Sequence, residues 1–514
     1  MQSVPQTVAG ANSPSTDRSF FGHPRGLATL FFTEMWERFT YYGMRALLIL
    51  FLVASVDRGG LGFSDGKAGA IYGLFTSMVY LTTLPGGWIA DRLMGQRRTV
   101  LLGGITIAAG SFLMVIPGTV TFYLGLTLIV MGTGLLKANI STMVGALYST
   151  NDNRRDAGFS IFYMGINIGA LIAPLICGYV GEKINWRYGF GLAGIGMTCG
   201  LIQFVLGWKH LGEAGKYAAT VNDPAQMASD RKLFFRVLTG VVALLVVLGG
   251  LTWSGVLPMS AEGLADVMGY VLLAVVVIFF AWLLFTGDWT PVERKRFVAI
   301  FVLFLAATLF WSAFEQAGST LNLFAERSTD RTLTGAAASL TSSWFPDHVY
   351  PASWFQSVNS IFIILLAPVL GWLWIRLGSK EPSSAAKFAL GLVFVGLGYL
   401  VIIPGAIHAA TGVQVSSIWL WSLYLLHTIG ELCISPVGLS AMTKLAPPKV
   451  VGLMMGVWFM AASAGNYIGG RMASVYEAFS PVTLFSAVAA FCIVLGLLLG
   501  AFTRPMKRLM GGIR

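Results

Sequence analysis

Residues 271–285 read VLLAVVVIFFAWLLF, and every side chain in this run is hydrophobic. Comparable apolar runs occur at Val241–Leu251 and Phe297–Phe310, each flanked by charged or turn residues. About 20 mostly apolar residues cross a bilayer as a helix, and lipid offers the backbone no hydrogen-bond partner outside the helix itself. The sequence therefore predicts an all-α integral membrane protein.

The composition of the whole chain agrees with that prediction. Of its 514 residues, 56% are hydrophobic and only 11% are charged, whereas an ordinary soluble domain carries roughly 25% charged residues. The apolar blocks predict about fourteen spans, at residues 27–54, 67–90, 99–117, 120–148, 158–181, 187–208, 233–254, 264–286, 295–325, 352–376, 386–406, 415–443, 451–477 and 481–503.

The placement of the basic residues predicts the orientation of these spans. If the amino terminus lies inside, the inside segments hold 24 of the 34 Lys and Arg residues and the outside segments hold six. Such an excess marks the cytoplasmic side of a membrane protein. We therefore expect both termini in the cytoplasm. The net charge of +11 then faces the inner leaflet of the lipid bilayer, and no nucleic-acid partner is needed to explain it.

Charged residues inside the first span form one face of a helix. Residues 34–45 read EMWERFTYYGMR, and at about 100° per residue the ionisable and phenolic side chains fall within an arc of about 140°. These side chains are Glu34, Glu37, Arg38, Tyr41, Tyr42 and Arg45. Charges in a bilayer interior usually face a water-filled cavity or a partner. A cavity that binds a charged solute and protons explains the stripe better than ion pairs that only hold helices together.

Three more charged residues lie inside other spans: Lys137 in the fourth, Glu315 in the ninth and Glu431 in the twelfth. Cations thus concentrate in the first half, and lone acids recur in the second. This polarity suits a zwitterionic solute, and a carboxyl whose charge depends on burial and on neighbouring cations suits proton-dependent switching. The alternative for each lone Glu is a protonated packing group. His427, one helical turn from Glu431, either tunes that carboxyl or is a satisfied core residue.

Two loop motifs indicate an internal repeat. Residues 87–98 read GWIADRLMGQRR after the second span, and residues 371–378 read GWLWIRLG after the tenth, with Ile375 in place of the acid. A parallel repeat of six-span bundles is common among secondary transporters. The predicted order is a cytoplasmic tail (1–26), a first six-helix bundle (27–208), a cytoplasmic linker (209–231), two inserted transmembrane helices (232–294), a second six-helix bundle (295–503) and a cytoplasmic tail (504–514).

These motifs resemble a known family. The loop Asp91–Arg98 looks like the signature of the major facilitator superfamily. The remaining motifs are similar to the proton-dependent oligopeptide transporter family, in its bacterial branch with two inserted helices. They are Glu34-x-x-Glu37-Arg38 with Tyr41-Tyr42-Gly43, Gly86–Asp91, Phe159–Ala170, Trp354–Asn359 and Gly430–Gly438. The resemblance runs from about Phe31 to the last span and implies the major facilitator fold.

The resemblance also implies roles for the matching residues. Proton coupling would involve Glu34, Glu37, Arg38, Glu315 and Lys137, and Arg45 would pair with Glu315 in an extracellular gate. Peptide binding would involve Arg38, Arg45, Tyr41, Tyr42, Tyr80, Lys137, Asn167, Trp311, Glu315, Asn359, Glu431, Ser435 and Trp458. For Tyr80 and Trp458, ordinary helix packing is the competing interpretation. Two departures from the family pattern concern Ala138, where we expect proline, and Phe314, where some members carry a second acid.

The function that follows is import of di- and tripeptides with protons by alternating access, in the cytoplasmic membrane of a bacterium. We expect a functional monomer, with no cofactor or metal beyond the coupling proton. One alternative is a transporter of another small solute, such as nitrate, a drug, a sugar or a peptide mimetic. A second is a peptide receptor derived from a transporter. Catalysis is rejected, because the sequence offers no nucleophile–base pair or metal-ligand cluster, and Asp288 lacks a second intramembrane Asp.

Overall fold

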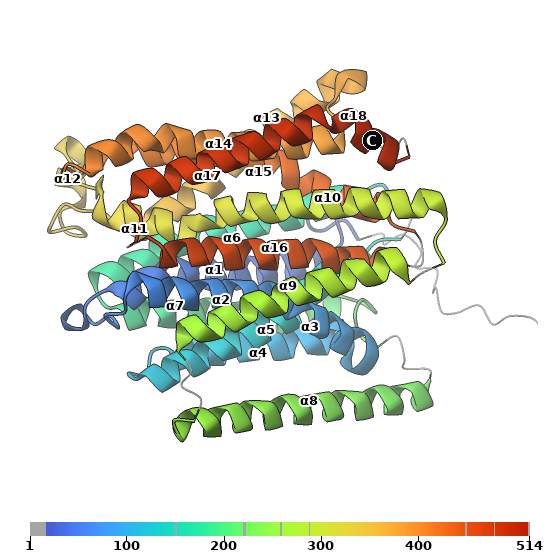
Figure 1. Cartoon of the computed structure of the whole chain (residues 1–514). Coiled ribbons are helices and arrows are strands. Elements are labelled where there is room, and N and C mark those ends of the chain that lie inside the picture. Colours follow the sequence, from blue (N-terminus) through green and yellow to red (C-terminus); the bar gives the residue numbers. More distant parts are fainter. Residues whose placement is uncertain are drawn as a thin grey trace, which may run out of the picture.

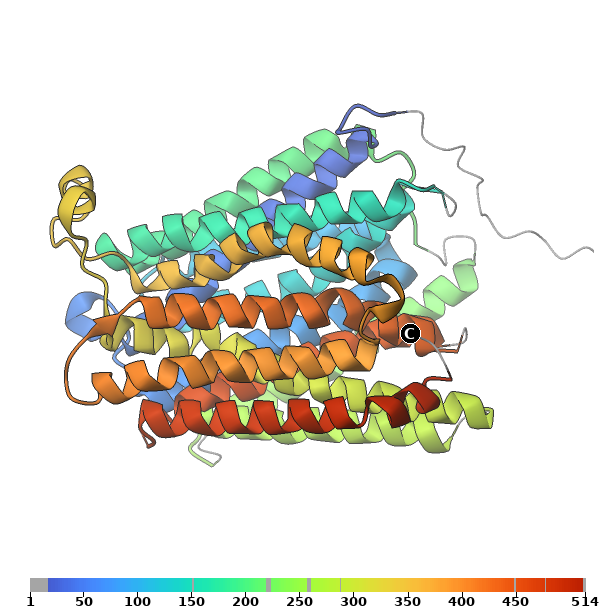
Figure 2. The same ribbon diagram turned by 90° about the horizontal axis from the view of Figure 1, so that it is seen from above.

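The computed structural model describes residues 17–149, 152–218, 223–256, 260–286, 288–447, 450–476 and 478–511. Long helices run roughly parallel through the molecule (Figures 1 and 2). The described strands, β1 (Thr329–Asp330) and β2 (Val415–Ser416), form one short parallel pair. Ten of the described helices are long and apolar enough to cross a membrane. The predicted all-α membrane fold is confirmed.

The first bundle contains the first six predicted spans. Its helices are α1 (Arg25–Val53), α2 (Asp65–Leu81), α3 (Thr83–Ile89), α4 (Gln96–Leu113), α5 (Thr119–Ala146), α6 (Arg155–Lys183) and α7 (Trp186–Gly207). Helix α1 packs against α6 and α7, and α4 packs against α5 and α7. The predicted span 67–90 is two helices, because the chain breaks at Thr82, whose hydroxyl donates to Met78 O (2.8 Å) and lies 3.1 Å from Val130 O of α5.

The second bundle contains the last six predicted spans. Its helices are α10 (Pro291–Phe314), α11 (Thr320–Arg327), α13 (Phe355–Leu377), α14 (Ser384–Ala409), α15 (Ile418–Leu445), α16 (Val451–Ser474) and α17 (Pro481–Ala501). Helix α12 (Gly335–Thr341) lies in the connection between α11 and α13, and α18 (Thr503–Leu509) follows α17. Helix α10 packs against α14 and α16, and α14 packs against α15 and α17.

The predicted span 295–325 is also interrupted. Helix α10 ends at Phe314, a 3-10 turn covers Glu315–Gly318, and α11 starts at Thr320. Gly318 lies so close to the side chains of Tyr72 and Arg45 that a Cβ there would overlap them. The break brings Glu315 next to the first bundle.

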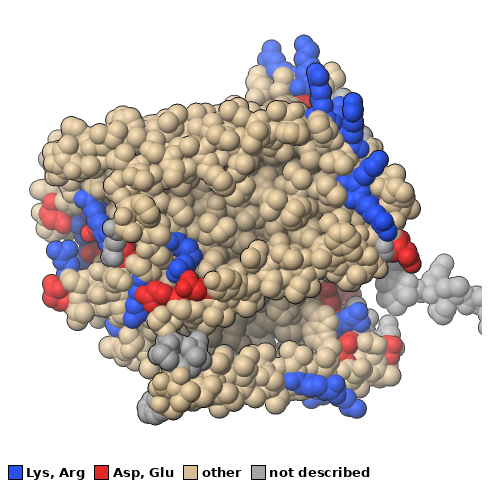
Figure 3. All heavy atoms as spheres, viewed as in Figure 1, with Lys and Arg blue, Asp and Glu red and all other residues tan. Residues whose placement is uncertain are grey.

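The two bundles meet along two helix pairs, α2 with α16 and α6 with α13. We call the end with the α1–α2 connection, α11 and α12 the sealed end, and the opposite end, where residues 17–24 and α18 lie, the terminal end (Figure 1). The connection with α12 projects beyond the helices at the sealed end (Figure 2). Lys and Arg gather at the terminal end, both signs of charge occur at the sealed end, and a broad uncharged area separates them on the face shown in Figure 3. This charge distribution suits a molecule with a lipid-facing belt.

The two inserted helices are α8 (Pro224–Trp253) and α9 (Ala261–Phe285). Helix α9 packs on α2, α10 and α16, whereas α8 stands apart from the bundles and contacts them at the turn after α3 (Figure 1). Helix α8 begins at Pro224, within the segment 209–231 that the sequence predicts as a linker. Asp223 caps that helix by accepting the N–H of Gln226 (2.9 Å), and proline is well tolerated at the first helical position.

The repeated loops differ in one backbone detail. After α3, residues Ala90–Met94 form a π-helical turn, and the N–H of Gly95 donates to Ala90 O (2.8 Å) with a φ of +79°. The second copy passes directly from α13 to Gly378, with a φ of +47°. The first loop reads Leu93-Met94-Gly95 and the second Leu377-Gly378, so Met94 is an extra residue. A π turn accommodates such an insertion, because its hydrogen bonds span one more residue than those of an α-helix.

Candidate functional site

The charged stripe of α1 is buried in the interior of the protein. Glu34, Glu37, Arg38 and Arg45 are each at most 5% exposed. Arg38 forms a two-point contact with Glu37, in which Nη2 donates to Oε1 over 2.7 Å and Nε donates to Oε2. Its Nε also lies 3.3 Å from Glu34 Oε1. The guanidinium of Arg38 is therefore already engaged by two carboxylates on its own helix.

Arg45 joins the two bundles. Its Nη2 lies 2.7 Å from Glu315 Oε2, and its Nε donates to the hydroxyl of Tyr72 over 2.8 Å. Both partners of the ion pair are 6% exposed at the side chain. A buried ion pair is strongly destabilised when one partner is lost, since the other charge remains desolvated. The pair therefore depends on how closely α1 and the end of α10 approach each other.

The acid of α15 has a neutral partner on α13. Asn359 donates through Nδ2 to Glu431 Oε2 (2.9 Å) and lies 3.0 Å from Thr428 Oγ1. His427 is fully buried and contacts the rings of Phe314, Tyr399 and Tyr424. His427 thus packs among aromatic side chains of the core.

Lys137 of α5 lies against aromatic rings. Its Nζ is 3.7 Å from the ring centroid of Tyr80 and 6.0 Å from that of Tyr41. A cation over an aromatic face is attracted by the ring quadrupole. Asn139, two residues further along, fixes α5 against α3 by donating through Nδ2 to Gly86 O (3.1 Å).

A cavity of about 170 Å³ lies between the bundles near the middle of the helices. Its lining combines the ion pair Arg45–Glu315, the acid Glu431, three amides and six aromatic rings. The lining residues are Tyr42, Arg45, Tyr80, Tyr163, Ile166, Asn167, Ala170, Trp311, Phe314, Glu315, Ala317, Gln356, Asn359, Ser360, Ile363, Tyr424, Glu431 and Ser435.

Several polar atoms of this cavity have no partner. Trp311 Nε1, Gln356 Nε2 and Ser435 Oγ are buried and make no hydrogen bond within the described part of the chain. Leaving a buried donor or acceptor unsatisfied costs about 1–3 kcal/mol, so such atoms suit a bound polar molecule. The cavity offers both signs of charge and unpaired hydrogen-bonding atoms to a small solute.

The cavity brings together nine of the residues predicted from the sequence. They are Tyr42, Arg45, Tyr80, Asn167, Trp311, Glu315, Asn359, Glu431 and Ser435. Glu34, Glu37, Arg38, Tyr41 and Lys137 are not among its lining residues and instead form the neighbouring cluster on α1 and α5. Trp458 is also absent from the lining. Its ring lies against Gly438 of α15, as ordinary helix packing predicts.

A family model described as the POT family matches residues 97–490. The chain belongs to the POT family. The predicted resemblance to the proton-dependent oligopeptide transporters is thereby confirmed.

Relatives of this POT-family chain match it over nearly its whole length. The peptide transporter YePEPT of Yersinia enterocolitica is 41% identical over 97% of this chain and 97% of its own length. The di-/tripeptide transporter of Lactococcus lactis subsp. cremoris is 38% identical over 98% of this chain and 100% of its own length. These relatives are transporters, so the chain belongs to a family of membrane transporters and is not an enzyme.

Solved POT structures share the fold. A crystal structure of a peptide transporter POT in complex with sulfate has a TM-score of 0.88 and 41% identity, with 96% of each chain covered. A POT family transporter in complex with 5-aminolevulinic acid has a TM-score of 0.87 and 35% identity, covering 95% of this chain and 98% of its own. The two-bundle architecture with inserted helices is therefore the POT arrangement.

Sequence reasoning missed part of the cavity of this POT-family protein. Tyr163, Phe314, Gln356 and Tyr424 line it but were assigned no role. A signal existed for Gln356, which lies one helical turn before Asn359 and shares its face. None existed for Tyr424, because only the packing of α15 against the other helices shows which of its aromatic residues face the cavity.

Proposed function

We propose that this protein imports di- and tripeptides together with protons by alternating access between the two bundles. The observation that carries the proposal is the Arg45–Glu315 pair, which links the bundles in the wall of a cavity with unpaired polar atoms. A peptide is a small zwitterion, so its carboxylate suits Arg45 and its ammonium suits Glu315 and Glu431. The cavity is smaller than the roughly 300–1,000 Å³ of drug-sized pockets, which favours a short peptide.

The proposed proton site is the cluster on α1. Because Glu34 and Glu37 occupy the guanidinium of Arg38, a solute carboxylate competes with them for it. Protonation of Glu37 removes one of the two competitors, so that the peptide carboxylate competes with Glu34 alone for Arg38. Proton binding and peptide binding then favour each other, and such coupling is reciprocal.

We further propose that the sealed end faces the outside and that both termini lie in the cytoplasm of a bacterial cell. The excess of basic residues at the terminal end supports this orientation. The names of the Yersinia and Lactococcus relatives support a peptide as the substrate. We propose the monomer as the functional unit, because the cavity lies between two bundles of a single chain, and the proton as the only coupling ion.

A second candidate is a small amino acid derivative. It rests on the solved POT family transporter in complex with 5-aminolevulinic acid, which is 35% identical to this chain. Such a solute carries the same two charges as a dipeptide and suits the same groups. Competition between the two solutes separates the candidates.

The test is uptake of labelled di-alanine into liposomes that contain the purified protein. An inward proton gradient and an inside-negative potential are imposed, with tri-alanine, 5-aminolevulinic acid and nitrate as competitors. We expect accumulation that a protonophore abolishes and that tri-alanine suppresses but nitrate does not. No accumulation in a protein that binds peptide would favour the receptor alternative.

The proton role is tested with Glu37→Gln. This change permanently removes one of the two competitors for Arg38, so we expect loss of proton-driven accumulation while exchange of labelled for unlabelled peptide continues. Glu213→Gln, which removes an exposed carboxylate paired with Lys216 in the linker, is the matched control. Proton-driven accumulation that survives Glu37→Gln would remove this residue from the coupling mechanism.

A further inference from the structure

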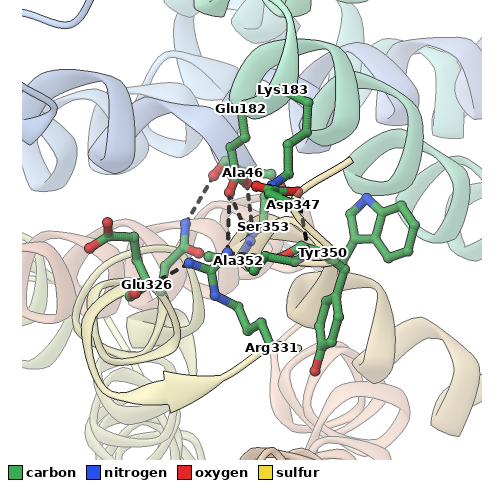
Figure 4. A network of polar contacts seen from close by, with 12 residues as sticks. Ala46, Glu182, Lys183, Glu326, Arg331, Asp347, Tyr350, Ala352 and Ser353 are labelled. Carbon is green, nitrogen blue, oxygen red and sulfur yellow. Dashed lines mark hydrogen bonds and ion pairs between the residues drawn. The ribbon is translucent and has the colours of Figure 1, made fainter. Parts of the chain in front are cut away.

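The sealed end contains a polar link between the bundles at the contact of α6 with the start of α13 (Figure 4). Glu182, in the last turn of α6, accepts two backbone N–H groups of the opposite bundle. Its Oε2 accepts from Ala352 over 2.8 Å, and its Oε1 accepts from Ser353 over 2.9 Å. Both oxygens of one carboxylate thus bind the first residues of the 3-10 turn Ala352–Trp354 that leads into α13.

The sequence at the start of this helix leaves these N–H groups without a local partner. The first N–H groups of a helix have no acceptor within it, and a Ser, Thr, Asp or Asn just before the helix usually supplies one. Here the preceding residue is Pro351, whose side chain has no acceptor, and no side-chain cap is present. Ala352 and Ser353 are fully buried, so water does not replace the cap. Glu182 therefore acts as the helix cap from the other bundle.

A cation on the second bundle strengthens this contact. Arg331 Nη1 lies 3.8 Å from Glu182 Oε2, and their side chains are 13% and 10% exposed. Arg331 is itself held by its own bundle, since it donates to Tyr350 O (2.8 Å) and Glu326 O (3.3 Å). The positive end of a helix dipole also attracts a carboxylate. Glu182 is thus the carboxylate that the first bundle contributes to this contact. The groups that it binds, at Ala352, Ser353 and Arg331, all belong to the second bundle.

The same face of α6 makes two more links to α13. Trp354 Nε1 donates to Leu175 O (3.0 Å), and Ser357 Oγ donates to Leu171 O (2.7 Å). Leu171, Leu175 and Glu182 are four and seven residues apart, which places them on one side of the helix. The carboxylate completes a continuous line of cross-bundle hydrogen bonds that ends at the surface of the sealed end.

We propose that Glu182 is a latch that stabilises the state sealed at this end, by capping helix α13 of the opposite bundle. This inference rests on the proposed alternating access. When the bundles separate at the sealed end, the carboxylate leaves the two N–H groups and Arg331. A contact made in one state only shifts the equilibrium toward that state by its full free energy. Glu182 is a positioning residue for transport and does not touch the cavity, because it is absent from the lining.

The test measures the sealed end directly in the full-length protein in lipid nanodiscs, without peptide or proton gradient. Spin labels are attached at Val56→Cys in the first bundle and Val413→Cys in the second, which are 73% and 53% exposed. The exposed native thiol is removed by Cys199→Ser. For Glu182→Gln we expect a longer distance between the labels to appear, with the ratio of open to sealed molecules about tenfold above that of the parent.

The matched control is Lys183→Gln. Lys183 Nζ lies 2.6 Å from Asp347 Oδ2 and also joins the bundles, but the Asp347 side chain is 56% exposed. An exposed ion pair contributes little, so we expect a shift of less than about twofold. An unchanged distance distribution in monodisperse Glu182→Gln protein overturns the proposal, and so does an equal shift in the control.

A second variant removes a donor and keeps the carboxylate. Ala352→Pro deletes one of the two N–H groups at a helix start, where proline is tolerated, and Pro351 already has the extended backbone that a following proline requires. We expect a shift in the same direction as for Glu182→Gln, and its absence in folded protein also overturns the proposal. Peptide uptake by the parent is measured separately. If the distances shift but the parent takes up no peptide, the latch stands and the proposed substrate fails.

Discussion

The two ends of the molecule use polar side chains differently. At the sealed end they cross between the bundles, as in the two-point pair of Arg327 with Asp65 (2.6 and 2.7 Å) and the bond from Ser474 Oγ to Gly66 O (3.0 Å). At the terminal end they hold the first bundle to its own segments. His23 contacts Tyr148 (2.9 Å), and Arg97 donates to Ala214 O of the linker (2.7 Å). In the proposed alternating access, contacts of the first kind exist in one conformation, whereas contacts of the second kind persist while the bundles move. Substitutions at the sealed end should therefore change the conformational equilibrium, and those at the terminal end only the stability.

The largest effect is expected for Arg45→Gln. The change leaves Glu315 buried without its cation, and breaking a buried pair costs about 3–5 kcal/mol. We therefore expect the sealed population to fall at least about hundredfold relative to the open one. The label pair at positions 56 and 413 measures this ratio. Arg45→Lys retains the charge, so its ratio of sealed to open molecules should lie between those of the parent and Arg45→Gln. Equal ratios for Arg45→Lys and Arg45→Gln would contradict the ion-pair explanation.

The second largest effect is expected from a steric clash in the contact between α2 and α16. A Cβ on Gly470 would overlap the backbone of Gly73, so Gly470→Leu has no room while the end is sealed. Overpacking typically costs about 1–3 kcal/mol, which corresponds to a shift of about fivefold to 150-fold toward the open form. Gly371→Leu is the matched control, because a Cβ at this helical glycine meets no neighbour. A shift in the control would point to a general effect of leucine.

Loss of one hydrogen bond at the same contact should have a smaller effect. Ser474→Ala removes the donor to Gly66 O, and a single neutral hydrogen bond contributes about 1 kcal/mol. We expect the ratio of open to sealed molecules, measured with the label pair, to rise about fivefold. Ser160→Ala removes a bond of similar length to Asp156 O within α6 alone (3.0 Å). That control should leave the distances unchanged.

The smallest effect is expected at the terminal end, and it concerns stability. Burial and the nearby Arg154 guanidinium lower the pKa of His23. The unfolded chain then takes up a proton near pH 6.5 before the folded protein does, so this histidine favours folding above that pH and the advantage is lost as pH falls. His23→Asn, with an amide atom near the position of Nδ1, should reduce the fall in thermal stability between pH 7.5 and 5.5. The label distances should stay the same. Any change in them would contradict the claim that substitutions at the terminal end alter only stability.

The sequence predicted the parts of this fold that depend on local order. Continuous apolar runs indicated the spans, and the spacing of charges on residues 34–45 indicated one buried stripe on α1. Proximity within one helix follows from its period alone. Nine predicted residues line the cavity, and five of them lie within the family motifs of the sequence: Tyr42, Asn167, Asn359, Glu431 and Ser435.

The sequence could not predict contacts between distant segments. Glu182 and Ala352 are 170 residues apart, and nothing in the spacing of either segment indicates the other. The sequence predicts Lys137 as a residue that binds the peptide. In the structure its ammonium group lies against the ring of Tyr80, and Lys137 is not among the residues that line the cavity. In each case packing between helices decided the outcome, and single-sequence periodicity does not contain that information.

The one-residue difference between the two repeated loops has a consequence for the inserted helices. Adding one residue to a helix end turns the following side chains by about 100°. In the first loop, this wider turn carries Arg92, which lies 3.6 Å from Asp230 of α8, while Asp91 accepts from Gln96 (2.9 Å). The second loop has neither the acid nor the extra residue. The two corners of the duplicated architecture thus differ by an inserted methionine and by an acid, and the corner that has both holds α8, the helix that stands apart from the bundles.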